Sequence, residues 1–379
     1  MPVASGPNTL GESSLVFAYD TGDVKNSYKG QPTVNVLPSS NVLLTSYNDH
    51  GGTHVTDTGF TLFGNATLRN TSNPAQDWNG VYLTGLSSIL TPGVTYTYSF
   101  YIYFTSDNTT ISYFGYGAPG YTGVKGQWNR VSTTFTATTQ DYFYVTLQYS
   151  NGQPVSTYYL ANLQIEQKSN PTQFINGTRS ATQGLLPLIG NSTINLTNVS
   201  FDSSAKIVFD GTNDYINIGV GTGINQFSGD FTVSLWAMRT AGGNYGNLIG
   251  DYYTNSTQTT GEWQIMMGPS SELNLYKVGP GYVINNIASG FSNNTWINVV
   301  VTRSGNLVTM YANSNAIATG TDSTSYGTVT GNLNIGIDGN NSSEPFPGKI
   351  DKVEIYNRAL TSQEVKQNYQ QYKTRFNLS

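Results

Sequence analysis

Four short stretches between residues 206 and 376 decide the fold: 207–216 (IVFDGTNDYI), 231–236 (FTVSLW), 296–302 (WINVVVT) and 346–360 (FPGKIDKVEIYNRAL). Apolar residues recur at every second position in these stretches, which is the pattern of a β-strand with one buried face. Several such strands in one segment can bury those faces by stacking two sheets. The stretches therefore predict an antiparallel β-sandwich.

The order of these stretches resembles that of the laminin G-like domains, which are concanavalin A-like β-sandwiches. The resemblance covers residues 181–379, nearly half of the chain. Sandwiches of this group serve as enzymes, lectins or passive building blocks, so the resemblance implies a fold without fixing a function. Residues 361–364 (TSQE) form a capping box, and Val365, Tyr369 and Tyr372 follow at helical spacing. We expect a short C-terminal helix that packs on the sandwich.

Residues 31–168 show the two-residue period even more clearly. In the stretch 96–104 (YTYSFYIYF), one face carries Tyr96, Tyr98, Phe100, Ile102 and Phe104, and the other carries Thr97, Ser99, Tyr101 and Tyr103. Turn signals separate several strands of this kind, which indicates a jelly roll. The region resembles the carbohydrate-binding-module-like domains of bacteriophage and secreted bacterial proteins. With a linker at 169–180, the predicted fold class is all-β, with two tandem antiparallel sandwiches.

The composition excludes several kinds of partner. Charged residues make up 10% of the chain and the formal net charge is -5, so no cluster of Lys and Arg is available for nucleic acid. With no cysteine, the chain has no disulfide framework. No apolar run reaches the roughly 18 residues that span a bilayer, and the first residues lack a signal-peptide pattern. We expect a protein that is made in a cytoplasm and does not insert into a membrane.

Residues 1–30 are too few to fold alone, although 15–19 (LVFAY) is a strand-like run. Such a segment either adds a strand to the following domain or docks on another subunit as an attachment arm. This segment and the junction at 169–180 resemble structural proteins of tailed bacteriophages, particularly those infecting cyanobacteria. The resemblance implies a virion surface protein, a capsid decoration, fibre or tail adhesin, held by other virion proteins through residues 1–30. A symmetric oligomer such as a trimer would suit that role.

Loops rich in aromatic residues are the candidates for binding a host-surface glycan. Aromatic rings can stack on the C–H faces of a sugar while nearby Asn, Asp and Gln side chains bond its hydroxyls. The candidate residues are Tyr113, Tyr116 and Tyr121 in the first sandwich, and Tyr245, Tyr252, Tyr253 and Trp263 in the second. Exposed aromatic residues also serve protein interfaces, which is the alternative interpretation. Trp236 and Trp296 lie within strands, and we expect both in the core.

Paired carboxylates would indicate an enzyme. Retaining glucanases place two of them about 5–5.5 Å apart, and strand residues share a face only at even spacing. Asp351 and Glu354 are three apart, and neither Glu262 nor Glu272 has an acidic residue two or four positions away. The sequence therefore predicts a protein that is not an enzyme. A purely structural cement protein and a polysaccharide depolymerase are the alternatives.

Calcium is the expected cofactor, on the strength of the resemblance alone. Concanavalin-like sandwiches commonly hold a structural ion between their first and last strands. The matching positions here are Asp210, in the stretch 209–211 (FDG), and Asp351, in the stretch 350–352 (IDK). Carboxylate and backbone oxygens are the ligands that calcium prefers. The alternative is that Asp210 only forms a turn before Gly211, while Asp351 is a partner for lysine.

Overall fold

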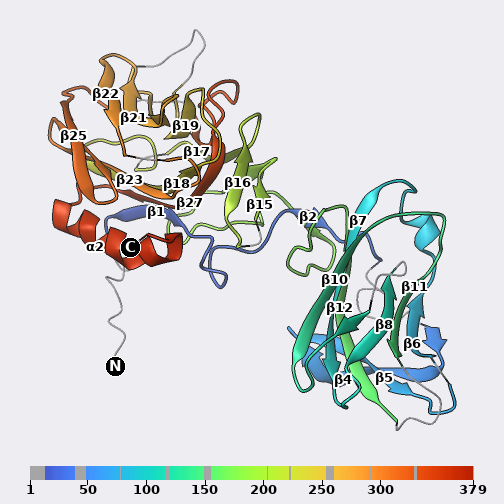
Figure 1. Ribbon diagram of the computed structural model, residues 1–379. Helices are drawn as coiled ribbons and strands as arrows, with labels where there is room; N and C mark the ends of the chain where they lie inside the picture. Colours follow the sequence, from blue (N-terminus) through green and yellow to red (C-terminus); the bar gives the residue numbers. More distant parts are fainter. Residues whose placement is uncertain are drawn as a thin grey trace, which may run out of the picture. The chain divides into compact units, whose positions relative to one another are not determined.

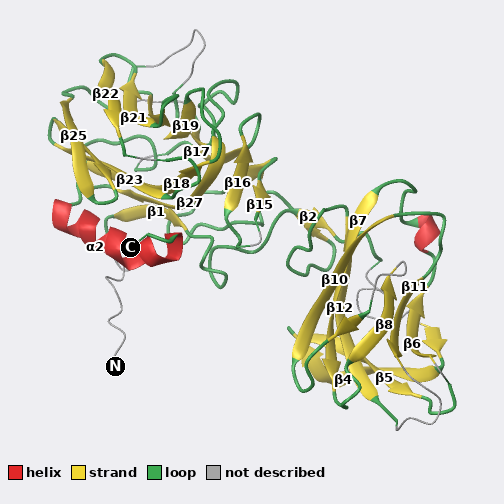
Figure 2. Cartoon of the chain, viewed as in Figure 1, coloured by secondary structure: helices red, strands yellow, loops and turns green. Residues whose placement is uncertain are grey.

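The computed structural model describes residues 13–38, 48–76, 78–115, 120–148, 155–202, 204–221, 223–252, 260–290, 292–327 and 331–378. The chain forms two compact units, one made of Met1–Gln31 with Ala181–Ser379 and the other of Pro32–Ser180. Antiparallel strands make up most of the regular structure in both units and the helices are short, which confirms the predicted all-β class (Figure 2). No helix in the described part of the chain is long and apolar enough to cross a membrane.

The unit Pro32–Ser180 is built from two packed sheets. The first, here called the aromatic sheet, has the order β10-β7-β12-β5-β4, and the second has the order β3-β6-β11-β8-β9. The predicted inward face of β7 is confirmed, because Tyr98, Phe100 and Ile102 belong to the buried core.

The strand bounds of the aromatic sheet are β4 (Gly52–Leu62), β5 (Asn65–Ser72), β7 (Thr95–Phe104), β10 (Trp128–Thr136) and β12 (Thr157–Glu166). Those of the second sheet are β3 (Asn48–His50), β6 (Trp78–Leu83), β8 (Thr110–Gly115), β9 (Tyr121–Thr122) and β11 (Phe143–Gln148). A separate pair joins β2 (Thr33–Val34) to β13 (Thr178–Arg179), and a 3-10 turn, η2, spans Leu86–Ser88.

The C-terminal unit is also a sandwich (Figure 1). Its back sheet has the order β15-β16-β27-β18-β23-β24-β25, with β1 added beside β27, and its front sheet has the order β14-β17-β26-β19-β20-β21-β22. Apolar residues from both inner faces, such as Val233 and Leu235 of β18 and Ile265 of β20, form one buried core. This is the sandwich that the alternating stretches predict.

The back-sheet strands are β1 (Leu15–Tyr19), β15 (Ser200–Phe201), β16 (Ile207–Asp210), β18 (Phe231–Arg239), β23 (Ile297–Ser304), β24 (Leu307–Ala312), β25 (Asn315–Thr321) and β27 (Pro347–Tyr356). The front-sheet strands are β14 (Asn195–Thr197), β17 (Tyr215–Gly219), β19 (Gly246–Gly250), β20 (Trp263–Met267), β21 (Glu272–Lys277), β22 (Gly281–Ala288) and β26 (Leu333–Ile335).

Strand β1 belongs to the C-terminal sandwich, a place that neither interpretation of residues 1–30 gave it. It pairs antiparallel with β27, where Phe17 faces Ile355 and Tyr19 faces Val353. Strand β16 pairs only with the first residues of β27, so the rest of that edge is open to β1. The side chains of Phe17 and Tyr19 are fully buried in the core. The described residues from 13 to 31 are therefore an integral part of this sandwich.

The C-terminal helix has the predicted capping box. Helix α2 (Ser362–Tyr372) begins after Thr361, whose side chain accepts from the Glu364 backbone, and a 3-10 turn, η3 (Lys373–Phe376), follows. Both lie against the back sheet (Figure 1). The Trp236 ring stacks on the rings of Tyr369 and Phe376, at centroid distances of 5.7 and 4.1 Å. Trp236 and Trp296 are buried as expected, but in this cluster on the outer face of the back sheet and not in the core between the sheets.

A buried ion-pair network holds both chain ends to β27. The Asp351 carboxylate is fully buried, and its Oδ2 accepts from Lys206 Nζ at 2.6 Å and from Arg375 Nη2 at 2.8 Å. Its Oδ1 accepts from the Thr21 hydroxyl at 2.6 Å, and Arg375 also pairs with Asp20. Burial alone would raise the pKa of Asp351, but the charges of Arg375 and Lys206 hold it below its ordinary value. Both partners are needed because an unpaired buried charge is costly.

We expect Arg375→Gln to lower the free energy of unfolding by about 2–3 kcal/mol, because it leaves Asp351 with one cation. For a domain of this size the melting temperature should fall by roughly 5–10 °C. The exposed Lys366 is the control, since Lys366→Gln also removes one positive charge, but from the surface of α2. Thermal melts followed by circular dichroism would measure both. Equal melting temperatures for the two variants would contradict the proposed role of Arg375.

The same network sets a pH dependence. Because the folded-state pKa of Asp351 is lowered, its contribution is present above the unfolded value of about 4 and is lost as the pH falls below it. Melting curves between neutral and acidic pH should therefore converge for the wild type and Arg375→Gln at the acidic end. A gap that stays constant across that range would show that Asp351 is not the group responsible.

Candidate functional site

Four tyrosines gather on the outer face of the front sheet, and we call them the tyrosine cluster: Tyr245, Tyr252, Tyr276 and Tyr282. The Tyr276 ring lies 4.8 Å from that of Tyr252 and 5.2 Å from that of Tyr282, centroid to centroid. Burial raises the pKa of the Tyr282 hydroxyl, and nearby Tyr245, Glu344 and Tyr276 raise it further. Tyr282 is nevertheless 45% exposed. The cluster thus presents aromatic surface to the solvent.

The strand register explains why these groups meet. Gln264 of β20 lies opposite Tyr276 of β21, which lies opposite Tyr282 of β22. Their strand neighbours, such as Ile265 and Leu275, are in the core, so this row projects outward. Gly250 of β19 completes the row beside Gln264. A Cβ at Gly250 would lie 2.5 Å from that of Gln264, so a side chain there would displace the row.

Polar side chains without complete hydrogen bonding lie under and beside the tyrosines. Four buried atoms have no hydrogen-bond partner: Asn247 Oδ1, Gln264 Oε1, Asn274 Nδ2 and Glu344 Oε2. Asn247, Gln264 and Asn274 are at most 1% exposed. Buried polar groups in folded proteins are nearly always paired, so unpaired ones call for an explanation such as a bound water or ligand. Four of them on one face make this the strongest candidate site among the described residues.

Glu344 comes from the loop between β26 and β27. Its backbone oxygen accepts from the Asn247 backbone N–H at 2.8 Å, which anchors the loop to β19. Its own backbone has φ of 55°, a left-handed conformation that is strained for a residue with a side chain. Burial raises the pKa of the Glu344 carboxyl, a hydrogen bond with Gln264 lowers it, and the charge of Asp338 raises it. The loop therefore holds a carboxyl group of raised pKa against the outward row.

The structure places the predicted binding residues unequally. Tyr245 and Tyr252 meet in the tyrosine cluster. Trp263 is fully buried, because it shares the inward side of β20 with Ile265, and its ring lies 5.9 Å from that of Phe227. Tyr121 is partly buried on β9, beside the core of the other unit. Tyr116, Tyr253 and the side chain of Tyr113 lie outside the described residues.

The sequence analysis missed Tyr276, Tyr282 and Glu344. A signal for Tyr276 exists, because it alternates with the core residues Leu273 and Leu275 and must point outward. Its opposition to Tyr282 follows from the pairing of β21 with β22, which turns at Gly279 and Gly281. No local pattern predicts Glu344, because its position depends on how a loop crosses a sheet.

The other unit carries a second aromatic surface, which we call the aromatic patch: Phe60, Tyr103, Trp128 and Tyr159 on the outer face of the aromatic sheet. The Phe60 ring lies 4.4 Å from that of Tyr159, 5.0 Å from Tyr103 and 5.6 Å from Trp128. All four side chains are partly exposed. A bulge after Asp57, whose Oδ1 accepts from the Phe60 amide at 3.0 Å, sets Phe60 over the sheet.

Two pairs of acidic residues in the described part of the chain are candidates for catalysis, and neither is an accessible catalytic pair. The expectation that Asp351 and Glu354 occupy opposite faces is wrong, because a β-bulge at Lys352 inserts one extra residue between them. Neither Asp351 nor Glu354 belongs to the core between the sheets, but both are buried and paired, Glu354 with Lys352 at 2.5 Å. A second pair, Asp251 and Glu262, comes from neighbouring strand ends, and both are at most 1% exposed. Burial raises the pKa of Asp251, and its two oxygens accept from Trp263 and Asn225.

Asp210 and Asp351 do not fit a shared calcium ion. Asp210 lies opposite Pro347, four residues along β27 from Asp351, which is roughly 13 Å at the usual rise of a strand. The Asp210 carboxylate accepts from the Thr212 amide at 2.7 Å and so forms a turn. Lys206 and Arg375 already occupy the side of Asp351 that a cation would take. In the described part of the chain, no three acidic or histidine side chains come together as metal ligands.

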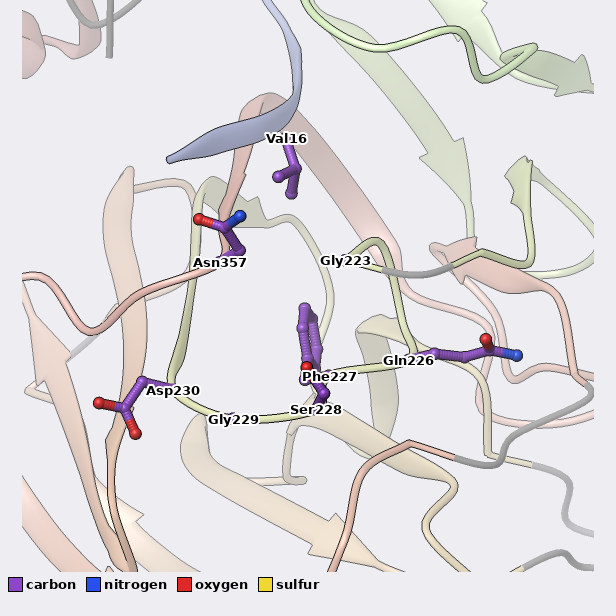
Figure 3. A pocket seen from close by; sticks show the side chains of 8 residues that line it. All are labelled: Val16, Gly223, Gln226, Phe227, Ser228, Gly229, Asp230 and Asn357. Atoms are coloured by element: carbon purple, nitrogen blue, oxygen red, sulfur yellow. The ribbon is translucent and has the colours of Figure 1, made fainter. Parts of the chain in front are cut away.

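Two cavities in the C-terminal unit are weaker candidates for a binding site than the tyrosine cluster. One of about 240 Å³ lies between Val16 and the loop that carries Phe227. Figure 3 shows the side chains of Gln226 and Asp230 pointing away from its centre. The other, of about 580 Å³, is lined by Lys206, Lys349, Arg375 and Trp296 among others.

The larger cavity has no unpaired cation for an anionic ligand. Lys349 Nζ lies 2.6 Å from the Asp202 carboxylate, while Lys206 and Arg375 belong to the Asp351 network. Any anion that entered would have to displace a carboxylate already in contact. This cavity is therefore a poor candidate for binding acidic groups.

Comparison with known proteins agrees with the architecture of the C-terminal unit. Residues 210–366 match the family described as the concanavalin A-like lectin/glucanases superfamily, and the unit has a fold of that kind. A search of curated proteins found no match. The resemblance to laminin G-like and concanavalin A-like domains is thus confirmed for this part of the chain.

Several solved structures are similar over about half of the chain. The receptor-binding domain of botulinum neurotoxin D shares 16% identity at a TM-score of 0.41, covering 51% of this chain and 51% of that domain. The serotype D ligand-binding domain in complex with N-acetylneuraminic acid has 16% identity, a TM-score of 0.40 and coverages of 51% and 49%. Domain 4 of an extracellular arabinanase from Geobacillus stearothermophilus, in complex with arabinotriose, has 19% identity, a TM-score of 0.35 and coverages of 47% and 82%.

We predict that neither excess EDTA nor added Ca²⁺ shifts the melting temperature of the C-terminal sandwich. An ion that bound only the folded state would stabilise it, with the logarithm of its concentration once above Kd, but Lys206 and Arg375 already neutralise Asp351. Differential scanning calorimetry with and without chelator makes the measurement, with Mg²⁺ as a control for ionic strength. A drop in melting temperature with EDTA, restored by Ca²⁺, would overturn the assignment.

Proposed function

We propose that this protein attaches to a surface by binding a glycan that it does not cleave, and that the tyrosine cluster is the binding site. Small-molecule sites combine aromatic surface with a few well-placed polar groups. The tyrosine cluster provides both, because Tyr276 and Tyr282 lie beside Gln264, Asn274 and Glu344. The unpaired buried polar atoms on this face are the observation that carries the proposal.

The aromatic patch offers a second contact with the same polymer or surface. Its four partly exposed rings share one face of a sheet, and Phe63 nearby is 71% exposed. Two weak sites in one chain raise the overall affinity through effective concentration without any new contact. A repetitive polysaccharide is the kind of ligand on which two sites can act together.

Binding without cleavage is favoured over hydrolysis. A retaining glycosidase needs two carboxyl groups that both reach the scissile bond. Asp251, Glu262, Asp351 and Glu354 are all at most 3% exposed. At the tyrosine cluster, Glu344 approaches the row from a loop, and its carboxylate neighbour Asp338 is itself buried. A polysaccharide depolymerase is therefore the weaker alternative, and an oligosaccharide-release assay separates it from a lectin.

The place of action that we propose is the surface of a tailed-phage virion, as a capsid decoration, fibre or tail adhesin. The support is the similarity of residues 1–30 and of the junction at 169–180 to structural proteins of such phages. Strand β1 is part of the C-terminal sandwich, so residues 15–19 are not free to serve as an arm. Contact with capsid or tail proteins, and a trimeric state, are parts of this proposal. A cement protein that binds no glycan is its alternative.

Truncating the exposed tyrosine of the cluster tests the binding site. We expect Tyr282→Ala to weaken binding to the best ligand from a glycan array about tenfold, because losing a contact aromatic costs roughly 1–2 kcal/mol. The control is Tyr142→Ala, which removes a similarly exposed ring, 42% against 45%, from the other unit. Isothermal titration measures both affinities. An unchanged affinity for Tyr282→Ala would remove the tyrosine cluster as the site.

Location is tested separately, on particles. Antibody raised against the purified protein should label the surface of intact virions of the source phage in negative-stain electron microscopy. Virions of an unrelated tailed phage serve as the control. Labelled virions together with a blank glycan array would favour the cement protein, whereas unlabelled virions would reject the virion placement and leave the glycan site standing.

A further inference from the structure

We propose that the tyrosine cluster takes a neutral or amine-bearing glycan and rejects glycans that carry carboxylates. This inference rests on the proposed function and adds the charge class of the ligand. It follows from two features of the outer face of the front sheet: which hydrogen-bonding atoms are unpaired there, and which charges surround them.

Acceptors outnumber donors among the unpaired atoms. Asn247 Oδ1, Gln264 Oε1 and Glu344 Oε2 can accept a hydrogen bond, and only Asn274 Nδ2 can donate one. The other atoms of these two side-chain amides are engaged, since Asn247 Nδ2 donates to the Ile337 carbonyl and Asn274 Oδ1 accepts from the Asn286 backbone N–H at 2.6 Å. A ligand that reaches these buried atoms and completes the set must supply several donors. Hydroxyl and ammonium groups do so, whereas a carboxylate only accepts.

The charged side chains that approach the cluster are acidic. Glu344 lies near Tyr282 and Gln264, and Asp338 lies behind the same loop. Glu272 reaches the other end, where a Cβ added at Gly268 would meet its Oε2 at 2.6 Å and the Tyr245 ring at 3.4 Å. A carboxylate brought close to another carboxylate is disfavoured, by about tenfold for each unit of pKa that the pair shifts.

The nearby cations do not offset this field for a ligand. Arg239 lies close enough to Glu272 for their charges to interact, but its side chain is fully buried. Its guanidinium donates to the backbone carbonyls of Ala241, Gly268 and Asn244. Lys277 of β21 is also fully buried and pairs with Asp322 at 2.7 Å. Neither of these cations is exposed for pairing with a sugar carboxylate.

Three tetrasaccharides of equal length test the inference on the full chain by isothermal titration: maltotetraose as the neutral probe, the fully deacetylated glucosamine tetramer as the cationic probe, and tetragalacturonate as the acidic probe. We expect one or both of the first two to bind and tetragalacturonate to bind at least tenfold more weakly than the better of them. Glu344→Gln should lower the affinity for the glucosamine tetramer relative to that for maltotetraose. It should also reduce, severalfold, the ratio between the affinity for the better-bound probe and that for tetragalacturonate. Asp107→Asn, which removes an exposed carboxylate from the other unit, is the control and should change none of the ratios.

The outcomes separate this inference from the function on which it rests. If tetragalacturonate binds as well as the better of the other two probes and Tyr282→Ala abolishes that binding, the glycan site stands and the charge class is overturned. If none of the three probes binds and a wider glycan array is blank, both proposals fail. Should Glu344→Gln not fold, as judged by circular dichroism, the comparison of the three probes on the wild type still decides.

Discussion

The carboxylate of Asp351 is the point on which the C-terminal sandwich depends, because it is fully buried and must keep its cations. Its partners come from three distant parts of the chain: Thr21 after β1, Lys206 before β16 and Arg375 in η3. Satisfying one charge therefore holds both ends of the unit against the last strand. The aromatic stack of Trp236, Tyr369 and Phe376 lies over the same strands and excludes water from that surface.

Because the C-terminal helices pack on the back sheet, the front sheet is the one whose outer face is available for binding. The outer face of the back sheet is covered by α2 and η3, which bury Trp236 and Trp296. On the front sheet the outward row ends instead in the partly exposed Tyr276 and Tyr282. The two-residue period of a strand thus separates two roles. Inward residues supply the apolar burial that stabilises the fold, and outward residues are available to contact a ligand.

The sequence predicts what depends on local pattern and fails where distant segments decide. The strands and the capping box at Thr361 follow from spacing that a few residues determine. The burial of Trp236 does not, because Trp236 alternates out of step with Leu235 and is covered by the distant Tyr369 and Phe376. The pairing of β1 with β27 does not, because it joins residues more than three hundred positions apart. The odd spacing of Asp351 and Glu354 predicts opposite faces of the strand. The bulge at Lys352 adds one residue between them and so brings both to the same face.

The alternation of inward and outward residues along a strand also explains which binding residues could be predicted. Trp263 alternates in step with Ile265 and Met267, so its inward direction is present in the sequence. Tyr276 alternates out of step with Leu275 and is outward for the same reason. Tyr245 and Glu344 lie in loops, where no period exists, and only the folded chain shows that they approach Tyr282. A search for outward aromatics within strands would therefore have found half of the tyrosine cluster.

The unpaired polar atoms under the tyrosines are best understood as a property of a binding site rather than a defect of the fold. Each buried polar group left without a partner costs about 1–3 kcal/mol, so four of them on one face are a substantial loss for a domain of marginal stability. The strained backbone of Glu344 adds to that loss. Local conflicts of this kind concentrate at functional sites, where a ligand or ordered water supplies the missing contacts. The described residues of this face include no exposed cation, so a ligand that reaches these atoms must bring hydrogen-bond donors. The energetic cost in the free protein is thereby connected to the chemistry of what it binds.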